Sequence, residues 1–209
     1  MPARIQQNTT PLRTISDFKS RLSGGGARPN LFEVELAFPD AVAIDNDILQ
    51  KARFLVKAAA LPASNIAPIE IPFRGRILKV AGDRTFDNWQ ITIINDENFI
   101  LRSAFETWMQ GISKNSNATG AVDPSAYMTY ALVHQLGRGA DAGRSSQGAS
   151  PSVSGTPVTP LKSYTFFDIF PTTISAIDLS YENSDAIEEF TVDFQVQYWE
   201  PGVYTKDNA

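Results

Sequence analysis

The stretch "AGDRTFDNWQITIINDEN", residues 81–98, passes from a glycine turn through a strand to the start of a helix. Trp89, Ile91 and Ile93 alternate with polar residues, which is the two-residue period of a half-buried β-strand. Asn95 or Asp96 then supplies a side chain suited to an N-cap, and a helix is predicted to about residue 110. Its apolar stripe has helical spacing and consists of Leu101, Phe105, Trp108 and Ile112. A strand followed at once by a helix with one apolar face predicts a helix packed on a β-sheet.

Alternation of apolar and polar residues recurs along the rest of the chain. The clearest case is "LFEVELAF", residues 31–38, in which four apolar residues alternate with Glu33 and Glu35. Further strands are predicted at 52–62, 127–136, 163–170, 174–181 and 188–200, with an acidic loop at 39–50. Because the strands are short and only one helix is substantial, the predicted fold class is mainly β, an antiparallel β-sandwich or barrel with one flanking α-helix.

A hairpin is predicted within "IEIPFRGRILKV", residues 69–80. Ile69, Ile71 and Phe73 alternate on the first strand, and the sequence Arg-Gly-Arg that follows reads as a bend or bulge. Pro72 has no N–H to donate, which argues against a central strand. An edge strand or a protruding hairpin is therefore expected.

Charge divides the chain into a basic arm and an acidic body. The net charge is −5, yet residues 1–30 carry five basic side chains and one acidic side chain, so the remainder carries the negative excess. Either the arm is solvated or it docks on an acidic neighbour. A short helix is predicted at 15–22, capped by Ser16. We expect a basic arm at 1–26, a β domain at 27–200 with a mobile Gly/Ser/Pro-rich loop at 137–160, and a tail at 201–209.

Residue types restrict the chemistry that the chain can perform. There is no cysteine, and His134 is the one histidine, so thiolate or multi-histidine metal sites are excluded. On its alternating segment His134 is expected to be a packed or partner-facing side chain. No serine lies in a nucleophile elbow, and the glycine-rich stretches lack the context of a phosphate loop. Acidic pairs such as Asp83/Asp87 and Glu188/Glu189 match glycosidase residue types, but such pairs are usually solvated. We expect no enzyme, cofactor or metal.

Long apolar segments are absent. No run of eighteen apolar residues occurs, and the N-terminus lacks the compact apolar stretch of a secretory signal. We expect a protein made and used in a cytoplasm, without a membrane partner.

Several segments together resemble a known family. "ARPNLFEVEL" (27–36), "KAAALPA" (57–63), "VAGDRTFDNWQITIINDE" (80–97) and "FTVDFQVQYWE" (190–200) occur in the order found in tail tube proteins of contractile-tailed, T-even-like bacteriophages. The A-G-D-R-T-F-D-x-W block is the most specific part of this resemblance. The loops at 39–50 and 137–160 depart from it, because both are longer than in compact members of the family.

The resemblance implies a β-sandwich subunit that assembles as six-membered rings stacked into a hollow tube, an architecture shared with type VI secretion tube proteins. Such a tube lies inside a contractile sheath in the virion, is assembled in the host cytoplasm, and conducts DNA without sequence-specific binding. The implied partners are further copies of the chain, the tail sheath protein, baseplate and tail-terminator proteins, and the tape measure protein in the lumen. Two alternatives stay open: a baseplate tube initiator of the same fold, and a monomeric glycan-binding β-sandwich.

Charged residues near the predicted hairpin are candidates for subunit contacts. Asp83, Arg84 and Asp87 are expected on the turn after it, where the resemblance implies contacts between neighbouring rings. Charge pairs there can fix register between copies, or they can form an internal ion pair on a surface turn. The predicted subunit interface comprises Arg21, Arg28, Arg74, Arg76, Asp83, Arg84 and Asp87.

Overall fold

The computed structural model describes residues 14–22, 26–40, 42, 46–137, 160–182 and 185–202. The chain divides into two units, one of Met1–Leu31 with Gln135–Leu161 and one of Phe32–His134 with Lys162–Ala209. Most of the predicted arm 1–26, loop 137–160 and tail 201–209 lies outside the described residues.

The first unit contains helix α1, Ile15–Arg21. The predicted helix is therefore confirmed, but its cap is Thr14 and not Ser16, which lies inside the helix. Thr14 has an extended backbone, and its hydroxyl oxygen accepts a hydrogen bond from the Asp17 N–H at 3.2 Å. In the same unit, the Gln135 side-chain amide donates to the carbonyl oxygen of Leu31 at 2.6 Å.

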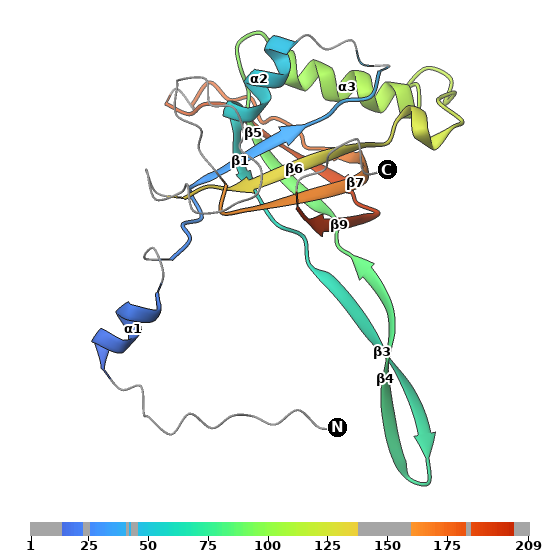
Figure 1. The fold of residues 1–209 in the computed structure, drawn as a ribbon. Helices are drawn as coiled ribbons and strands as arrows, with labels where there is room; N and C mark the ends of the chain where they lie inside the picture. Colours follow the sequence, from blue (N-terminus) through green and yellow to red (C-terminus); the bar gives the residue numbers. More distant parts are fainter. Residues whose placement is uncertain are drawn as a thin grey trace. The chain divides into compact units, whose positions relative to one another are not determined.

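The second unit is built on a seven-stranded sheet (Figure 1). The hydrogen-bonded order is β1-β6-β7-β8-β5-β2, and β9 pairs with β7. The strands are β1 Phe32–Leu36, β2 Val56–Ala59, β5 Trp89–Ile94, β6 Thr129–Gln135, β7 Lys162–Ile174, β8 Glu189–Gln195 and β9 Tyr198–Pro201. The pairs β2–β5, β5–β8, β7–β8 and β7–β9 are antiparallel. The predicted antiparallel, mainly β class is confirmed, and the sheet does not close into a barrel.

Strand β7 is one long strand that changes partners along its length. Its first part, Tyr164–Phe167, pairs with β9, and its last part, Phe170–Ile174, pairs with β8. Asp168 lies between the two parts with a φ of 53°, a left-handed conformation that lets a strand turn a corner between two sheet layers. The separate strand predicted at 174–181 is wrong, because residues 175–180 form no strand.

The core lies between the two parts of the folded sheet and beneath helix α3, Ile100–Ile112. Trp89 of β5 stacks on Phe166 of β7 with ring centroids 4.8 Å apart. From α3, Trp108 packs on Phe194 of β8 at 6.0 Å and donates its indole N–H to the Tyr127 carbonyl oxygen at 2.8 Å. The predicted helix and its apolar stripe are thus confirmed, but its N-cap is Phe99 and not Asn95 or Asp96. The Asp96 carboxylate instead accepts a hydrogen bond from the Ile100 N–H at 3.1 Å.

Helix α2, Asn46–Leu55, replaces a predicted loop and the beginning of a predicted strand. Ile48, Ala52 and Leu55 contact the core at a spacing of four and three residues, which is the helical period. The predicted strand at 52–62 was based on the alternation after residue 52, and the helical stripe was missed. In the structure, only Val56–Ala59 of this range forms a strand. A short 3-10 helix, η2, covers Pro124–Ala126. None of the helices in the described ranges is long and apolar enough to cross a membrane.

His134 is a packed side chain, as predicted. It is 4% exposed, and its Nδ1 lies 2.7 Å from the Ser163 hydroxyl oxygen. Its Nε2 lies 3.6 Å from Oε1 of Glu35 on β1, a carboxylate that also pairs with Arg53 of α2. The interaction with His134 is the main cause that lowers the pKa of Glu35; burial raises this pKa, and the charge of Arg53 lowers it further. This cluster ties β1, β6 and α2 together.

Candidate functional site

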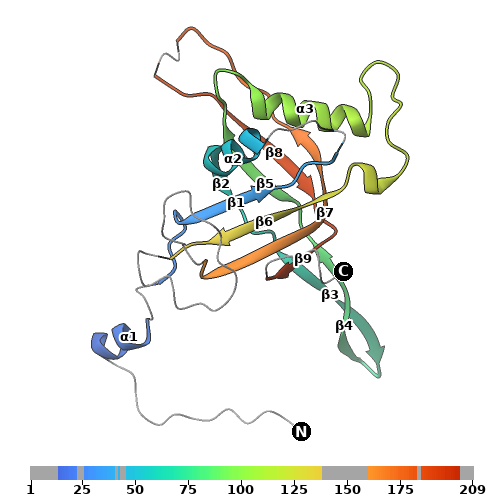
Figure 2. The same ribbon diagram turned by 45° about the horizontal axis from the view of Figure 1, so that its top comes forward.

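A two-stranded hairpin extends away from the sheet of the second unit (Figures 1 and 2). Its strands are β3, Ser64–Phe73, and β4, Arg76–Phe86, and among the described residues they pair only with each other. Arg74 and Gly75 connect them, and their φ values of 46° and 81° are those of a tight two-residue turn that matches the strand twist. The protruding hairpin predicted from Pro72 and the Arg-Gly sequence is confirmed.

One face of the hairpin is apolar and exposed. Directly paired residues lie on the same face of a ribbon, and Ile69 pairs with Val80 while Ile71 pairs with Leu78. All of them are exposed, with Phe73 at 66% and Leu78 at 59%. We name the apolar hairpin face as Ile69, Ile71, Phe73, Leu78 and Val80. A contiguous set of large exposed apolar side chains marks an interaction surface.

The other face of the hairpin is more polar. There Lys79 pairs with Glu70 at 3.0 Å. Pro68 and Pro72 lie on the same strand as Glu70, and the pairing with β4 continues through both prolines. Proline cannot donate a hydrogen bond, so β3 offers an incomplete edge to any additional strand. The hairpin is therefore better suited to contact a partner through its apolar face than through the β3 edge.

A bulge at Gly82 explains the glycine of the A-G-D-R-T-F-D block. The pairing shifts by one residue between Ile66/Arg84 and Pro68/Ala81, which leaves an extra residue in β4. A Cβ atom at Gly82 would lie 2.6 Å from the Ala67 carbonyl oxygen, so the close approach of the two strands requires glycine. The extra residue reverses the alternation of side chains beyond the bulge and places Arg84 opposite Ile66.

The structure separates the predicted interface residues into distinct places. Arg74 and Arg76 lie at the hairpin tip, where the Arg74 guanidinium lies 5.4 Å from the centre of the Phe73 ring. Asp83 and Arg84 are on strand β4 and not on a turn, which corrects the sequence reading. Arg76 and Asp83 are seven positions apart on β4, which is about 23 Å along an extended strand.

The remaining predicted residues lie at the hairpin base and in the first unit. Asp87 accepts a hydrogen bond from the Asn65 amide at 2.9 Å, and its own N–H donates to Ala63, so it holds the base of the hairpin together. Arg21 is in the last turn of α1, and the backbone carbonyl of Arg28 accepts from Gln135. The predicted set is therefore not one patch.

Sequence reasoning missed the apolar hairpin face as a functional surface. Its alternation was visible, but apolar alternation is normally attributed to a sheet core. The usable signal was the combination of alternation on both arms of a hairpin with prolines on one arm, because prolines keep such a hairpin out of a central sheet position.

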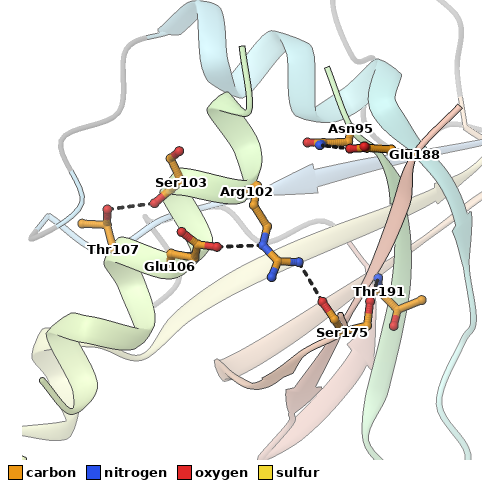
Figure 3. A network of polar contacts seen from close by, with 8 residues as sticks. All are labelled: Asn95, Arg102, Ser103, Glu106, Thr107, Ser175, Glu188 and Thr191. Carbon is orange, nitrogen blue, oxygen red and sulfur yellow. Dashed lines mark hydrogen bonds and ion pairs between the residues drawn. The ribbon is translucent and has the colours of Figure 1, made fainter. Parts of the chain in front are cut away.

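Helix α3 is fastened to the connection between β7 and β8 by a polar network (Figure 3). Arg102 donates to the Ser175 carbonyl oxygen at 2.7 Å and pairs with Glu106 at 2.8 Å. On the far side of the connection, Asn95 donates to the Glu188 carboxylate at 3.0 Å. In the described residues no group of three or more acidic or histidine side chains is arranged to hold a metal ion.

Comparisons with known proteins agree on one family. The family model described as "Phage tail tube protein" matches residues 27–201. Tail tube protein gp19 of Enterobacteria phage T4 is 32% identical over 85% of this chain and 93% of its own length. The fold is shared with a chain of the anti-feeding prophage baseplate, with a TM-score of 0.56, 11% identity and coverage of 86% of this chain and 98% of that one. It is also shared with a chain of the extended sheath-tube complex of an extracellular contractile injection system, with a TM-score of 0.54, 12% identity and coverage of 92% and 99%. The chain therefore belongs to the phage tail tube protein family.

Proposed function

We propose that copies of this chain form six-membered rings that stack into the hollow tube of a phage tail. The observation that carries the proposal is the apolar hairpin face, which the single chain leaves exposed. Burying one large apolar side chain contributes about 1.5 to 3 kcal/mol, so five of them can support a stable contact with a second copy. Stacking makes such a contact heterologous, with different surfaces of the two copies in contact.

Ring closure uses a second surface. The path of hydrogen-bonded strands ends at β1 on one side and β2 on the other, counting only the described residues. An open strand can pair with the sheet of a neighbour, which extends the sheet around a ring. Six copies are proposed because the resemblance to tail tube proteins implies them, and a chain of a six-fold symmetrised baseplate shares the fold.

The proposed tube has defined partners and a passive role. Structures that share the fold come from a sheath-tube complex, a baseplate and a sheath/tube terminator, which supports contacts with a tail sheath protein, baseplate and terminator proteins. Within the lumen we propose the tape measure protein and then DNA, passing without sequence-specific binding. The chain carries a net charge of −5, so phosphates meet few of the cationic contacts that would retain them. No catalytic step is required, and assembly takes place in the host cytoplasm.

In this proposal, charged residues of the hairpin fix the position of one copy relative to the next. Arg74 and Arg76 at the tip and Asp83 and Arg84 near the base bracket the apolar hairpin face. Charges at the rim of an apolar contact steer association and exclude wrong registers more than they add affinity.

A matched pair of substitutions tests the proposal. Ile77 and Leu78 are adjacent, and both are 59% exposed, but they lie on opposite faces of β4. We expect Leu78→Ser to remain folded by circular dichroism and to lose tubes in electron micrographs, whereas Ile77→Ser keeps them. The loss of about 1 to 3 kcal/mol per contact is repeated at every subunit of a ring. Normal tubes from Leu78→Ser, or equal loss from both variants, would contradict a contact through the apolar hairpin face.

A tube initiator in a baseplate is the second candidate, because a baseplate chain shares the fold. An initiator forms rings and does not extend into long tubes by itself. Micrographs of the unmodified chain separate the two, since rings without tubes favour the initiator. A protein that remains monomeric on a sizing column would favour the glycan-binding sandwich.

A further inference from the structure

Helix α1 carries an apolar stripe that the single chain does not cover. Ile15, Phe18 and Leu22 fall on one side of the helix, and they are 75%, 63% and 43% exposed. A helix of seven residues is only marginally stable alone in water and gains most of its stability from packing an apolar face. α1 also precedes residue 27, where the match to the family model begins. Its exposed apolar stripe is therefore suited to pack against another apolar surface.

A second uncovered apolar surface lies on the connection between β7 and β8. Leu179, Tyr181 and Ile187 are 80%, 109% and 71% exposed. They line an open groove of about 620 Å³, formed by residues 176–181 and 186–189. The groove belongs to the second unit, and its apolar side chains have the size and number to match the stripe of α1.

Both ends of this connection are held in place. Ser175 accepts from Arg102 through its carbonyl oxygen, and its hydroxyl oxygen accepts from the Thr191 N–H at 2.9 Å (Figure 3). At the other end, the Asn95 N–H donates to the Glu188 carbonyl oxygen at 2.9 Å. The groove is therefore presented on a base anchored to α3 and the sheet, which lowers the entropy that docking must overcome.

Charge identifies the partner of the groove. Residues 176–189 contain five acidic and no basic side chains. Glu188 and Glu189 are engaged by Asn95 and Lys57, but Asp178, Glu182 and Asp185 form no ion pair within the described ranges. In contrast, the last turn of α1 carries Lys19 and Arg21.

We propose that α1 of one copy docks into the groove formed by residues 176–181 and 186–189 of a second copy, with Ile15, Phe18 and Leu22 against Leu179, Tyr181 and Ile187. The contact rests on the proposed function, because it joins neighbouring copies in the assembled tube. The exposed acidic side chains Asp178, Glu182 and Asp185 complement the basic last turn of α1, and the experiment below separates docking between copies from docking within one chain. The apolar hairpin face is a poorer receptor, because its tip carries Arg74 and Arg76, which repel the basic turn of α1.

The absence of cysteine from the chain permits an unambiguous crosslinking experiment. Lys19 flanks the apolar stripe, Ser20 lies on the opposite side of α1, and Ser180 is exposed between Leu179 and Tyr181. Untagged Ser180→Cys protein is mixed with tagged Lys19→Cys protein, assembled and oxidised, and the tagged–untagged dimer is measured on a denaturing gel. The control replaces Lys19→Cys by Ser20→Cys. A disulfide forms only where the two Cα atoms approach to about 4.4 to 6.8 Å.

If α1 docks as proposed, Lys19→Cys gives the tagged–untagged dimer and Ser20→Cys does not. Adding Phe18→Ser to Lys19→Cys should also abolish this dimer, because the apolar contact is removed. Equal crosslinking from Lys19→Cys and Ser20→Cys, or none from either, overturns the proposal. So does an intrachain crosslink in the double variant Lys19→Cys/Ser180→Cys, since it would place the contact within one chain. If the unmodified chain forms no tubes, the proposed function is contradicted. The docking is then still tested, because the same crosslinks can be measured on the soluble protein.

Discussion

At the scale of single residues, Glu35 makes the stability of the fold depend on pH. Its pKa is lowered, chiefly by the interaction with His134 and further by Arg53, so the folded state favours the charged carboxylate. The unfolded chain binds the proton more readily, at the ordinary value of 4.5. The contribution of Glu35 is therefore complete above about this pH and is lost as the pH falls through the lowered pKa.

Replacement of this carboxylate tests the linkage. We expect Glu35→Gln to lower the free energy of unfolding by about 1 to 3 kcal/mol at pH 7, because Arg53 and His134 lose a charged partner. The difference from the unmodified chain should shrink as the pH falls below 4.5. Urea unfolding at several pH values measures both effects, with Glu70→Gln at the exposed hairpin pair as the control. A difference that is constant with pH would show that Glu35 contributes through packing alone.

At the scale of elements, the hairpin is stabilised mainly by its own pairing and by its base. Phe86 at the end of β4 packs against Trp199 of β9 with ring centroids 6.1 Å apart, and the apolar hairpin face beyond it is open. Elements with few buried contacts open at low free energy. A change confined to β3 and β4 should therefore alter the hairpin and leave the core intact.

The bulge at Gly82 provides such a change. Gly82→Ala places a Cβ atom 2.6 Å from the Ala67 carbonyl oxygen, so the strands must move apart, at a cost of about 1 to 3 kcal/mol. We expect faster hydrogen exchange in β3 and β4, an unchanged melting temperature of the core, and fewer tubes. Gly111→Ala in α3 is the control, because its new Cβ would meet no atom beyond the neighbouring backbone of its own helix and alanine favours a helix. Unchanged exchange in Gly82→Ala would show that the ribbon tolerates the added methyl group.

Elements with a local signal were predictable, and elements shaped by tertiary contacts were not. The α3 stripe and the hairpin turn could be recognised because period and turn chemistry act within a few residues. Helix α2 was not predicted for two reasons. Its apolar stripe of Ile48, Ala52 and Leu55 contains the small residue Ala52, and the first part of the helix falls in the segment 39–50, which was predicted to be an acidic loop. The corner at Asp168 depends on β7 pairing with β9 before this residue and with β8 after it, which no local pattern encodes. For the same reason the sequence predicted the position of the hairpin, but it did not show which face of the hairpin contacts a partner.

At the scale of the whole molecule, the proposed assembly uses several exposed surfaces of the chain. In the proposals above, the apolar hairpin face, the open sheet strands β1 and β2, and the apolar stripe of α1 each contact a neighbouring copy. A subunit with distinct, non-overlapping contact surfaces builds an ordered array, because each surface meets a different neighbour. Family membership gives this array the form of a tube.

Cryo-electron microscopy of the purified, assembled chain shows directly whether the hairpin joins stacked rings. We expect stacked six-membered rings around an open channel, with Phe73 and Leu78 of the apolar hairpin face buried against a neighbouring copy. Rings or tubes in which this face stays exposed to solvent would contradict the proposed stacking contact, and a protein that remains monomeric at high concentration would contradict the tube itself.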